Sequence, residues 1–308
     1  MSSTAPASQI HLRTPPEPGK KPASRTYLIY FVTGNPGLVE YYRTFLTHLY
    51  GLLTHNTASD LSIEFQVYGR SLSGFEMNDA EIKTMKWRKQ PPYGLQDQIR
   101  HSEDELAELV EEVKESGGAR DVRASPFLKN SNFATFAALF VNFLTMFLPI
   151  SILTTLIAKF MDFPTDAAQT TAAFVKSPHG IHEALHMARD EMFQIDTDIW
   201  DEEIWGAAAS EPATKHPHPR PILRFLFARK DHWVADATRD ALIHTRGRFS
   251  RGDGVEEVEG QGENWKPVME IDEREGWPHG FCIRHGVPVA EKVAGYVRAI
   301  VAQDMARK

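Results

Sequence analysis

Two residues in the second half of the sequence have the side chains and the settings of an acid–base pair. Asp231 follows the apolar segment 222–227, and His279 lies in the loop 276–281 before a final helical stretch. In open α/β sheets the site forms at the carboxyl ends of the strands. A histidine oriented by an aspartate can take the proton of a serine hydroxyl and so prepare it for acyl transfer. We therefore expect Asp231, as the acid, and His279, as the base, to lie within hydrogen-bonding reach at the carboxyl edge of a parallel sheet.

Each of these residues also has a plainer interpretation. Asp231 could be a helix cap or a solvated loop residue, and His279 could be a surface histidine. Their order along the chain, an acid after a late strand and then a histidine near the C-terminus, favours the pair.

A glycine-rich turn is a candidate for the oxyanion region of the same site. It follows the apolar segment 26–32 and precedes 38–53, where apolar residues have helical spacing. Glycine lets the backbone approach a ligand, and amides near a helix N-terminus can stabilise an oxyanion. A plain strand-to-helix turn is the alternative. The residues of this turn, which we expect near the acid–base pair, are Gly34, Asn35, Pro36 and Gly37.

The nucleophile is the member of the site that the sequence does not supply. No Gly-x-Ser-x-Gly motif occurs anywhere in the 308 residues. Ser71, in Gly-Arg-Ser-Leu-Ser, fits a relaxed form of the motif, but the strand before it comes one crossover too early and no apolar helix follows. An ordinary loop serine is the better interpretation of Ser71. Ser125 and Cys282 have weaker settings still.

A second kind of site is suggested by His182-Glu183-Ala-Leu-His186. On a helix, residues four apart share a face, so His182 and His186 could bind zinc while Glu183 activates water. The extended metalloprotease pattern is missing because Arg189 stands where its glycine would be. A polar helix face is therefore the preferred interpretation.

The predicted elements alternate between strands and helices, which is typical of an α/β fold. Strands are expected at 26–32, 63–68 and 222–227, and a long amphipathic helix at 95–116. Such a helix should cross over into a parallel strand, yet 119–126 contains no apolar run. The central strand and the nucleophile turn are therefore predicted to be missing.

Composition limits the class of partner. The chain has 34 Lys and Arg against 41 Asp and Glu, a net charge of −7, and one cysteine. An acidic balance without a basic cluster argues against nucleic acid as a partner, and one cysteine forms no internal disulfide and is typical of an intracellular protein. No cofactor is predicted. Residues 1–25 have no apolar core of a signal peptide and are predicted to be a disordered tail.

The most hydrophobic part of the chain, 133–158, is free of charged residues and contains Pro149 near its centre. Three interpretations compete: buried core helices, a transmembrane span, and a monotopic hairpin in a lipid monolayer. We prefer the monotopic hairpin, because Pro149 divides the run into two parts that are each short for a span.

Four motifs together resemble the lipid droplet-associated hydrolases, a branch of the α/β-hydrolase superfamily. The first two are the Gly-Asn-Pro-Gly turn with Leu-Val-Glu-Tyr-Tyr after it and Leu-Gln-Asp-Gln-Ile at 95–99. The others are Lys-Asp-His-Trp-Val at 230–234 and Pro-His-Gly-Phe at 278–281, with Arg284-His285 behind it. The resemblance covers most of the chain from Thr26 onward.

This resemblance implies a serine hydrolase of lipid or sterol esters at the lipid droplet, with Asp231 and His279 in the triad and the Asn35 loop near the oxyanion. The expected fold is α/β-hydrolase-like: one domain over 26–308, a mostly parallel sheet flanked by helices, and a hydrophobic helical insertion at 127–165. The expected partners are a lipid ester and the droplet monolayer. The expected location is the cytosolic face of the droplet, or the endoplasmic reticulum.

The family carries Gly-His-Ser-x-Gly, which this chain lacks. A non-catalytic lipid-droplet protein or a truncated isoform is therefore the alternative to an active hydrolase. A zinc hydrolase that uses His182, Glu183 and His186 is the less favoured one.

Overall fold

The computed structural model describes residues 6–15, 23, 25–55, 63–77, 91–115, 145, 148–194, 223–251 and 267–306. Contacts divide the chain into two units, one of 1–196 with 282–298 and one of 197–281 with 299–308. Within the described residues, no helix is both long and apolar enough to cross a membrane. The predictions for 119–126, Ser125 and most of 127–147 lie outside the described residues.

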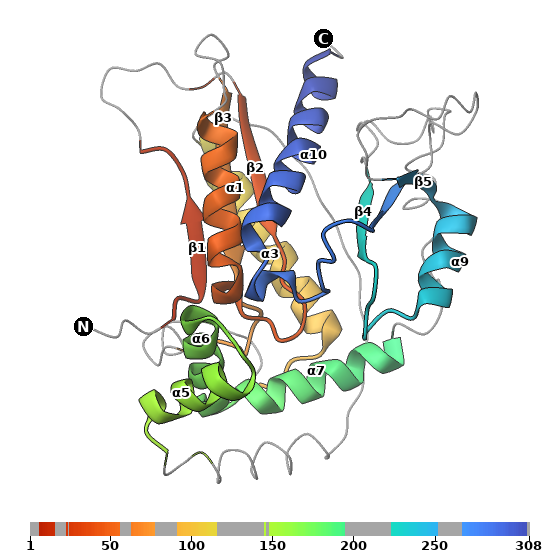
Figure 1. Ribbon diagram of the computed structural model, residues 1–308. Coiled ribbons are helices and arrows are strands. Elements are labelled where there is room, and N and C mark those ends of the chain that lie inside the picture. The colour runs from red at the N-terminus through yellow and green to blue at the C-terminus, as the bar shows by residue number, and fades with distance from the viewer. Residues whose placement is uncertain are drawn as a thin grey trace. The chain divides into compact units, whose positions relative to one another are not determined.

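The first unit is built on a three-stranded sheet of order β1-β3-β2 (Figure 1). Strand β2 (Arg25–Phe31) pairs in parallel with β3 (Ile63–Arg70), and β1 (Gln9–Leu12) pairs antiparallel to β3. The expected strands at 26–32 and 63–68 are therefore confirmed. The structure differs from the predicted disordered tail at β1. Pairing with β3 gives this four-residue segment backbone partners and buries Ile10, and a segment so short has no clear strand pattern of its own.

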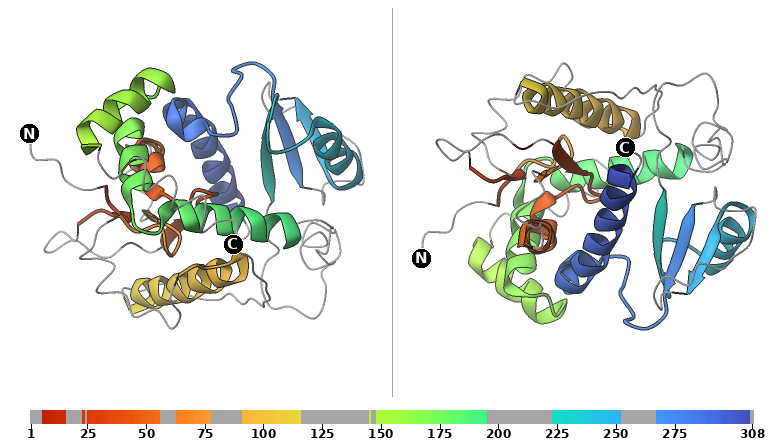
Figure 2. Two further views of the ribbon diagram at one scale, coloured as in Figure 1. Left: turned by 90° about the horizontal axis from the view of Figure 1, so that it is seen from below. Right: turned by 90° about the horizontal axis from the view of Figure 1, so that it is seen from above.

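Alternate residues of β2 face opposite sides of this sheet, as strand geometry requires. Tyr30 stacks on Tyr68 and faces helix α3 (Leu95–Glu115), whereas Phe31 packs against Phe45 of α1 (Arg43–His55). The two helices therefore cover opposite faces of the sheet (Figure 2). The helix expected over 38–53 is divided, since a 3-10 turn, η1 (Val39–Tyr42), precedes α1.

Three further helices belong to the first unit: α5 (Ile150–Phe160), α6 (Thr165–Lys176) and α7 (Gly180–Gln194). Leu153 and Ile157 of α5 are buried against small residues of α6. These two residues of the hydrophobic run therefore belong to the core, whereas other residues of α5 are exposed. The last helix, α10 (Gly286–Ala306), joins this unit up to Arg298, whose guanidinium donates a hydrogen bond to the Leu52 carbonyl at 2.8 Å.

The second unit has a parallel sheet of order β4-β6-β5. Its strands are β4 (Arg224–Ala228), β5 (Arg248–Arg251) and β6 (Val268–Asp272). Helix α9 (Asp236–Arg246) packs Ile243 on the fully buried Met269 of β6. The expected strand at 222–227 is confirmed as β4. A mixed α/β fold is therefore confirmed in both units.

Candidate active site

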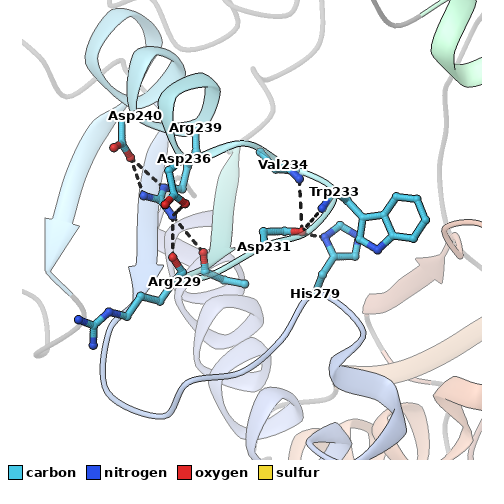
Figure 3. A network of polar contacts seen from close by, with 9 residues as sticks. Arg229, Asp231, Trp233, Val234, Asp236, Arg239, Asp240 and His279 are labelled. Atoms are coloured by element: carbon cyan, nitrogen blue, oxygen red, sulfur yellow. Dashed lines mark hydrogen bonds and ion pairs between the residues drawn. The ribbon is translucent and has the colours of Figure 1, made fainter. Parts of the chain in front are cut away.

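Asp231 and His279 lie at the same edge of the second sheet. Strands β4 and β6 run in parallel, and their last residues, Ala228 and Asp272, are register partners. The loops that leave these two strand ends bring His279 Nδ1 to 2.8 Å from Asp231 Oδ2 (Figure 3). The structure thus brings the two predicted side chains together at the carboxyl edge of a parallel sheet. Their catalytic roles stay predictions.

Asp231 is held on both of its carboxylate oxygens. Oδ2 accepts the hydrogen bond from His279, and Oδ1 accepts the backbone N–H groups of Trp233 at 2.7 Å and Val234 at 3.3 Å. Burial by itself raises the pKa of Asp231, but these backbone donors and the adjacent His279 outweigh it and keep the pKa below its usual value. Asp231 is therefore an ionised, oriented carboxylate at neutral pH.

The imidazole of His279 has the orientation of a general base. Its side chain is 56% exposed, whereas that of Asp231 is 7% exposed, so the acid is covered and the base is accessible. With the carboxylate ionised, Nδ1 carries the proton and Nε2 has the free electron pair. Nε2 can then take a proton from a hydroxyl or a water, and Asp231 stabilises the imidazolium that forms.

Arg239 fixes the strand end from which the Asp231 loop starts. Its buried guanidinium donates to the backbone carbonyls of Ala228, at 3.3 Å, and Arg229, at 3.0 Å, and contacts the carboxylates of Asp236 and Asp240 (Figure 3). Helix α9 is thereby tied to the end of β4. Arg239 has no distinctive signal in the sequence, because a helical arginine near two aspartates indicates only a surface charge pattern.

Asp272 has the corresponding role for the His279 loop. It is the last residue of β6, is buried, and accepts the N–H groups of Glu275 at 3.0 Å and Trp277 at 2.6 Å. These bonds shape the turn that leads to His279. The signal that could have found Asp272 is the one that found Asp231, an acidic residue where an apolar strand ends.

The family model described as lipid-droplet associated hydrolase matches residues 25–124 and 116–282, which include the glycine turn, Asp231 and His279. The chain belongs to this family. No curated protein matched the sequence. The two matched segments overlap at 116–124. This overlap includes the first part of 119–126, the segment in which the sequence predicts no apolar strand.

The glycine turn that the family resemblance places near the oxyanion belongs to the first unit. Asn35 Nδ2 donates to the Ala184 carbonyl of α7 at 2.9 Å, and Gly37 accepts the N–H of Leu72 at 2.8 Å. A side chain at position 37 would collide with Leu72, which explains that glycine. Because the turn and the acid–base pair lie in different units, their proximity stays a prediction.

The weak nucleophile candidates have contacts of a structural kind. Ser71 is 3% exposed, its Oγ accepts the N–H of Val39 at 3.1 Å, and its own N–H binds the Ser8 carbonyl. It thus connects β3 with η1 and the N-terminal segment. Burial raises the pKa of the Cys282 thiol to about 11, so this cysteine is a thiol at neutral pH, not a reactive thiolate.

The zinc candidates lie on one helix, α7, with the rings of His182 and His186 6.3 Å apart. Glu183 is fully buried, and its Oε2 accepts the N–H of Tyr93 at 3.0 Å. Among the residues that the structure describes, no group of three or more potential metal ligands comes together. These contacts favour a structural role for Glu183.

Proposed function

We propose that this member of the lipid-droplet associated hydrolases acts on lipid-type esters, with His279 as general base and Asp231 as the residue that orients it. The observation that carries the proposal is the 2.8 Å hydrogen bond between them at the carboxyl edge of β4 and β6. In such a site, His279 Nε2 takes the proton of the attacking hydroxyl and later returns it to the leaving alcohol.

The attacking group is the part of this mechanism that the sequence leaves open. The chain has no Gly-x-Ser-x-Gly, and within the described residues the His279 ring is hydrogen-bonded to Asp231. A dyad without a serine can still deprotonate water, but it forms no acyl-enzyme. A low rate of ester hydrolysis is therefore expected from this chain.

The test is hydrolysis by the purified full chain of a medium-chain p-nitrophenyl ester and of a cholesteryl ester emulsion. His279→Ala is expected to remove the hydrolysis, and Asp231→Asn to reduce it at least tenfold. His232→Ala, an exposed histidine next to Asp231, is the matched control and should leave the rate unchanged. Activity that survives in His279→Ala would contradict the proposal.

A second candidate function is that of a non-catalytic lipid-droplet protein, and helix α5 favours it. Leu153 and Ile157 of α5 are buried against α6, yet other large apolar side chains of this helix and of its C-terminal end are exposed. Phe160 is 80% exposed. Exposed apolar surface of this kind indicates contact with lipid or protein, and the uncharged sequence before α5 favours lipid. The exposed residues are Ile150, Ile152, Leu156, Phe160 and Met161.

Flotation with phospholipid-coated triacylglycerol droplets tests this contact. Ile152→Lys combined with Leu156→Lys should weaken binding at least tenfold, since lysine in hydrocarbon is strongly unfavourable. Ser151→Lys with Thr155→Lys adds the same charge to the exposed polar positions of α5 and is the matched control. Equal binding by both variants would exclude α5 as the contact. Droplet binding by a wild-type chain that hydrolyses neither ester would favour the non-catalytic function.

A further inference from the structure

The edge of the second sheet that carries Asp231 and His279 also carries an exposed tryptophan. The side chain of Trp233 is 75% exposed, and no other large hydrophobic residue in the described part of the second unit is exposed. Single exposed apolar side chains are common on protein surfaces, so exposure alone means little. The position of Trp233, in the same loop as the acid and at the same sheet edge as the exposed base, is what requires an explanation.

The main chain of Trp233 is fixed by the same carboxylate that orients His279. Asp231 Oδ1 accepts the Trp233 N–H at 2.7 Å, and Oδ2 accepts the hydrogen bond from His279 Nδ1 at 2.8 Å. The indole and the imidazole extend to the same side of Asp231 (Figure 3). Because the imidazole is itself 56% exposed, a surface that receives the indole also meets His279.

The loop that leaves β6 adds apolar surface beside the imidazole. Pro278, which precedes His279, is exposed, and Trp277 is half-buried with its N–H bound to Asp272 at 2.6 Å. At each of the two strand ends an aspartate thus binds the N–H of a tryptophan in the loop. Hydrogen bonds hold both loops in shape, so little ordering is needed when their tips meet a partner.

The exposed charges at this edge have both signs. Arg229 and Lys230 lie in the loop after β4, and Glu273, Arg274 and Glu275 lie in the loop after β6. A zwitterionic phospholipid headgroup also carries both signs, a phosphate and an ammonium group, so it suits this edge better than a surface of one sign. Tryptophan concentrates at the interface of lipid and water, because its ring is apolar and its N–H is polar.

We propose that Trp233 inserts its indole into the headgroup region of a zwitterionic phospholipid monolayer and so binds the carboxyl edge of β4 and β6 to that surface. The ring leaves water, while its N–H still finds phosphate or ester oxygens as acceptors. His279 then lies at the layer through which a lipid ester reaches the site, a consequence that rests on the proposed function. The contact is separate from the exposed residues of α5, which belongs to the first unit.

Flotation of the full chain with triolein droplets coated with phosphatidylcholine tests the contact. Trp233→Ala should weaken binding about tenfold, and Trp233→Phe, which keeps an aromatic ring without the N–H, only about threefold. Phe193→Ala removes a ring that is 67% exposed on α7 and is the matched control, which should bind like the wild type. A wild-type chain that does not float, unchanged binding in Trp233→Ala, or an equal loss in Phe193→Ala would each overturn the proposal.

Fluorescence on the same droplets shows whether the indole itself enters the monolayer. The chain has six tryptophans, so the contribution of Trp233 is the difference between the wild type and Trp233→Phe. With phosphatidylcholine brominated on its acyl chains, the wild type should lose emission that Trp233→Phe does not lose, and equal quenching in both would overturn the proposal. Neither measurement depends on catalysis. A chain that binds through Trp233 but hydrolyses no ester would contradict only the proposed function.

Discussion

His279 in the second unit and His101 in the first differ in the partner that binds the same ring nitrogen. Nδ1 of His279 meets the carboxylate of Asp231, whereas Nδ1 of His101 meets the hydroxyl of Ser73, both at 2.8 Å. A carboxylate orients the ring and leaves Nε2 to take a proton from elsewhere, while a hydroxyl is itself the group that would lose its proton. The two histidines thus differ in the chemistry of the Nδ1 partner, a carboxylate in the second unit and a hydroxyl in the first.

The carboxylates near the two histidines also have different tasks. Asp231 acts directly on its histidine. Glu105, which lies on α3 one turn from His101, instead accepts from Tyr68 at 2.9 Å, Tyr30 at 3.1 Å and Arg70 at 2.5 Å. Donors on the sheet bind both carboxylate oxygens of Glu105. A carboxylate close to a histidine in the sequence is therefore not always its hydrogen-bond partner.

The largest effect that tests this contrast is expected from Glu105→Ala. Its loss leaves Arg70 and two tyrosine hydroxyls without their acceptor, so the free energy of unfolding should fall by about 3 kcal/mol. Urea denaturation followed by circular dichroism measures it. Glu108→Ala, at an exposed position of α3, should change the value by less than about 0.5 kcal/mol. Similar values for the two variants would mean that the hydrogen bonds of Glu105 contribute little to the stability of the first unit.

A smaller loss of stability is expected from Arg239→Ala in the second unit. The substitution removes the donors that tie the end of β4 to α9, and we expect the free energy of unfolding to fall by about 2 kcal/mol. The nearby Arg229 has an exposed side chain, so Arg229→Ala serves as the control in the same urea titration. If Arg239→Ala left the free energy of unfolding unchanged, the hydrogen bonds from α9 to the end of β4 would not be needed for stability.

The smallest effect concerns the titration of Asp231. Its folded pKa lies below the unfolded value, so its ionised form stabilises the fold above about pH 4 and this contribution is lost as the pH falls through the lower folded pKa. His279→Ala removes one donor and should move that loss to higher pH. Carboxyl ¹³C NMR of Asp231 measures the shift, with His232→Ala as control. If the pKa of Asp231 were the same in His279→Ala, the 2.8 Å hydrogen bond from His279 would not stabilise the ionised carboxylate.

Local sequence patterns predicted the elements and one pair of the candidate site. Apolar runs predicted β2 and β4, alternation predicted β3, and helical spacing predicted α3. A strand-end position singled out Asp231, and the loop before the last helix singled out His279. These predictions succeed because burial of one strand or one helical face leaves its period in the sequence. Chain order then sufficed for the pair, since parallel strands end at one edge of a sheet.

Tertiary structure alone decided which side chains meet over long distances in the chain. Strand β1 forms because β3 offers it a backbone partner, and Ser73 meets His101 because α3 packs on the sheet next to the end of β3. Arg239 becomes an anchor only where α9 reaches the carbonyls that end β4. Polar residues of this kind have no period in the sequence, so their roles arise from packing between segments and not from local propensity.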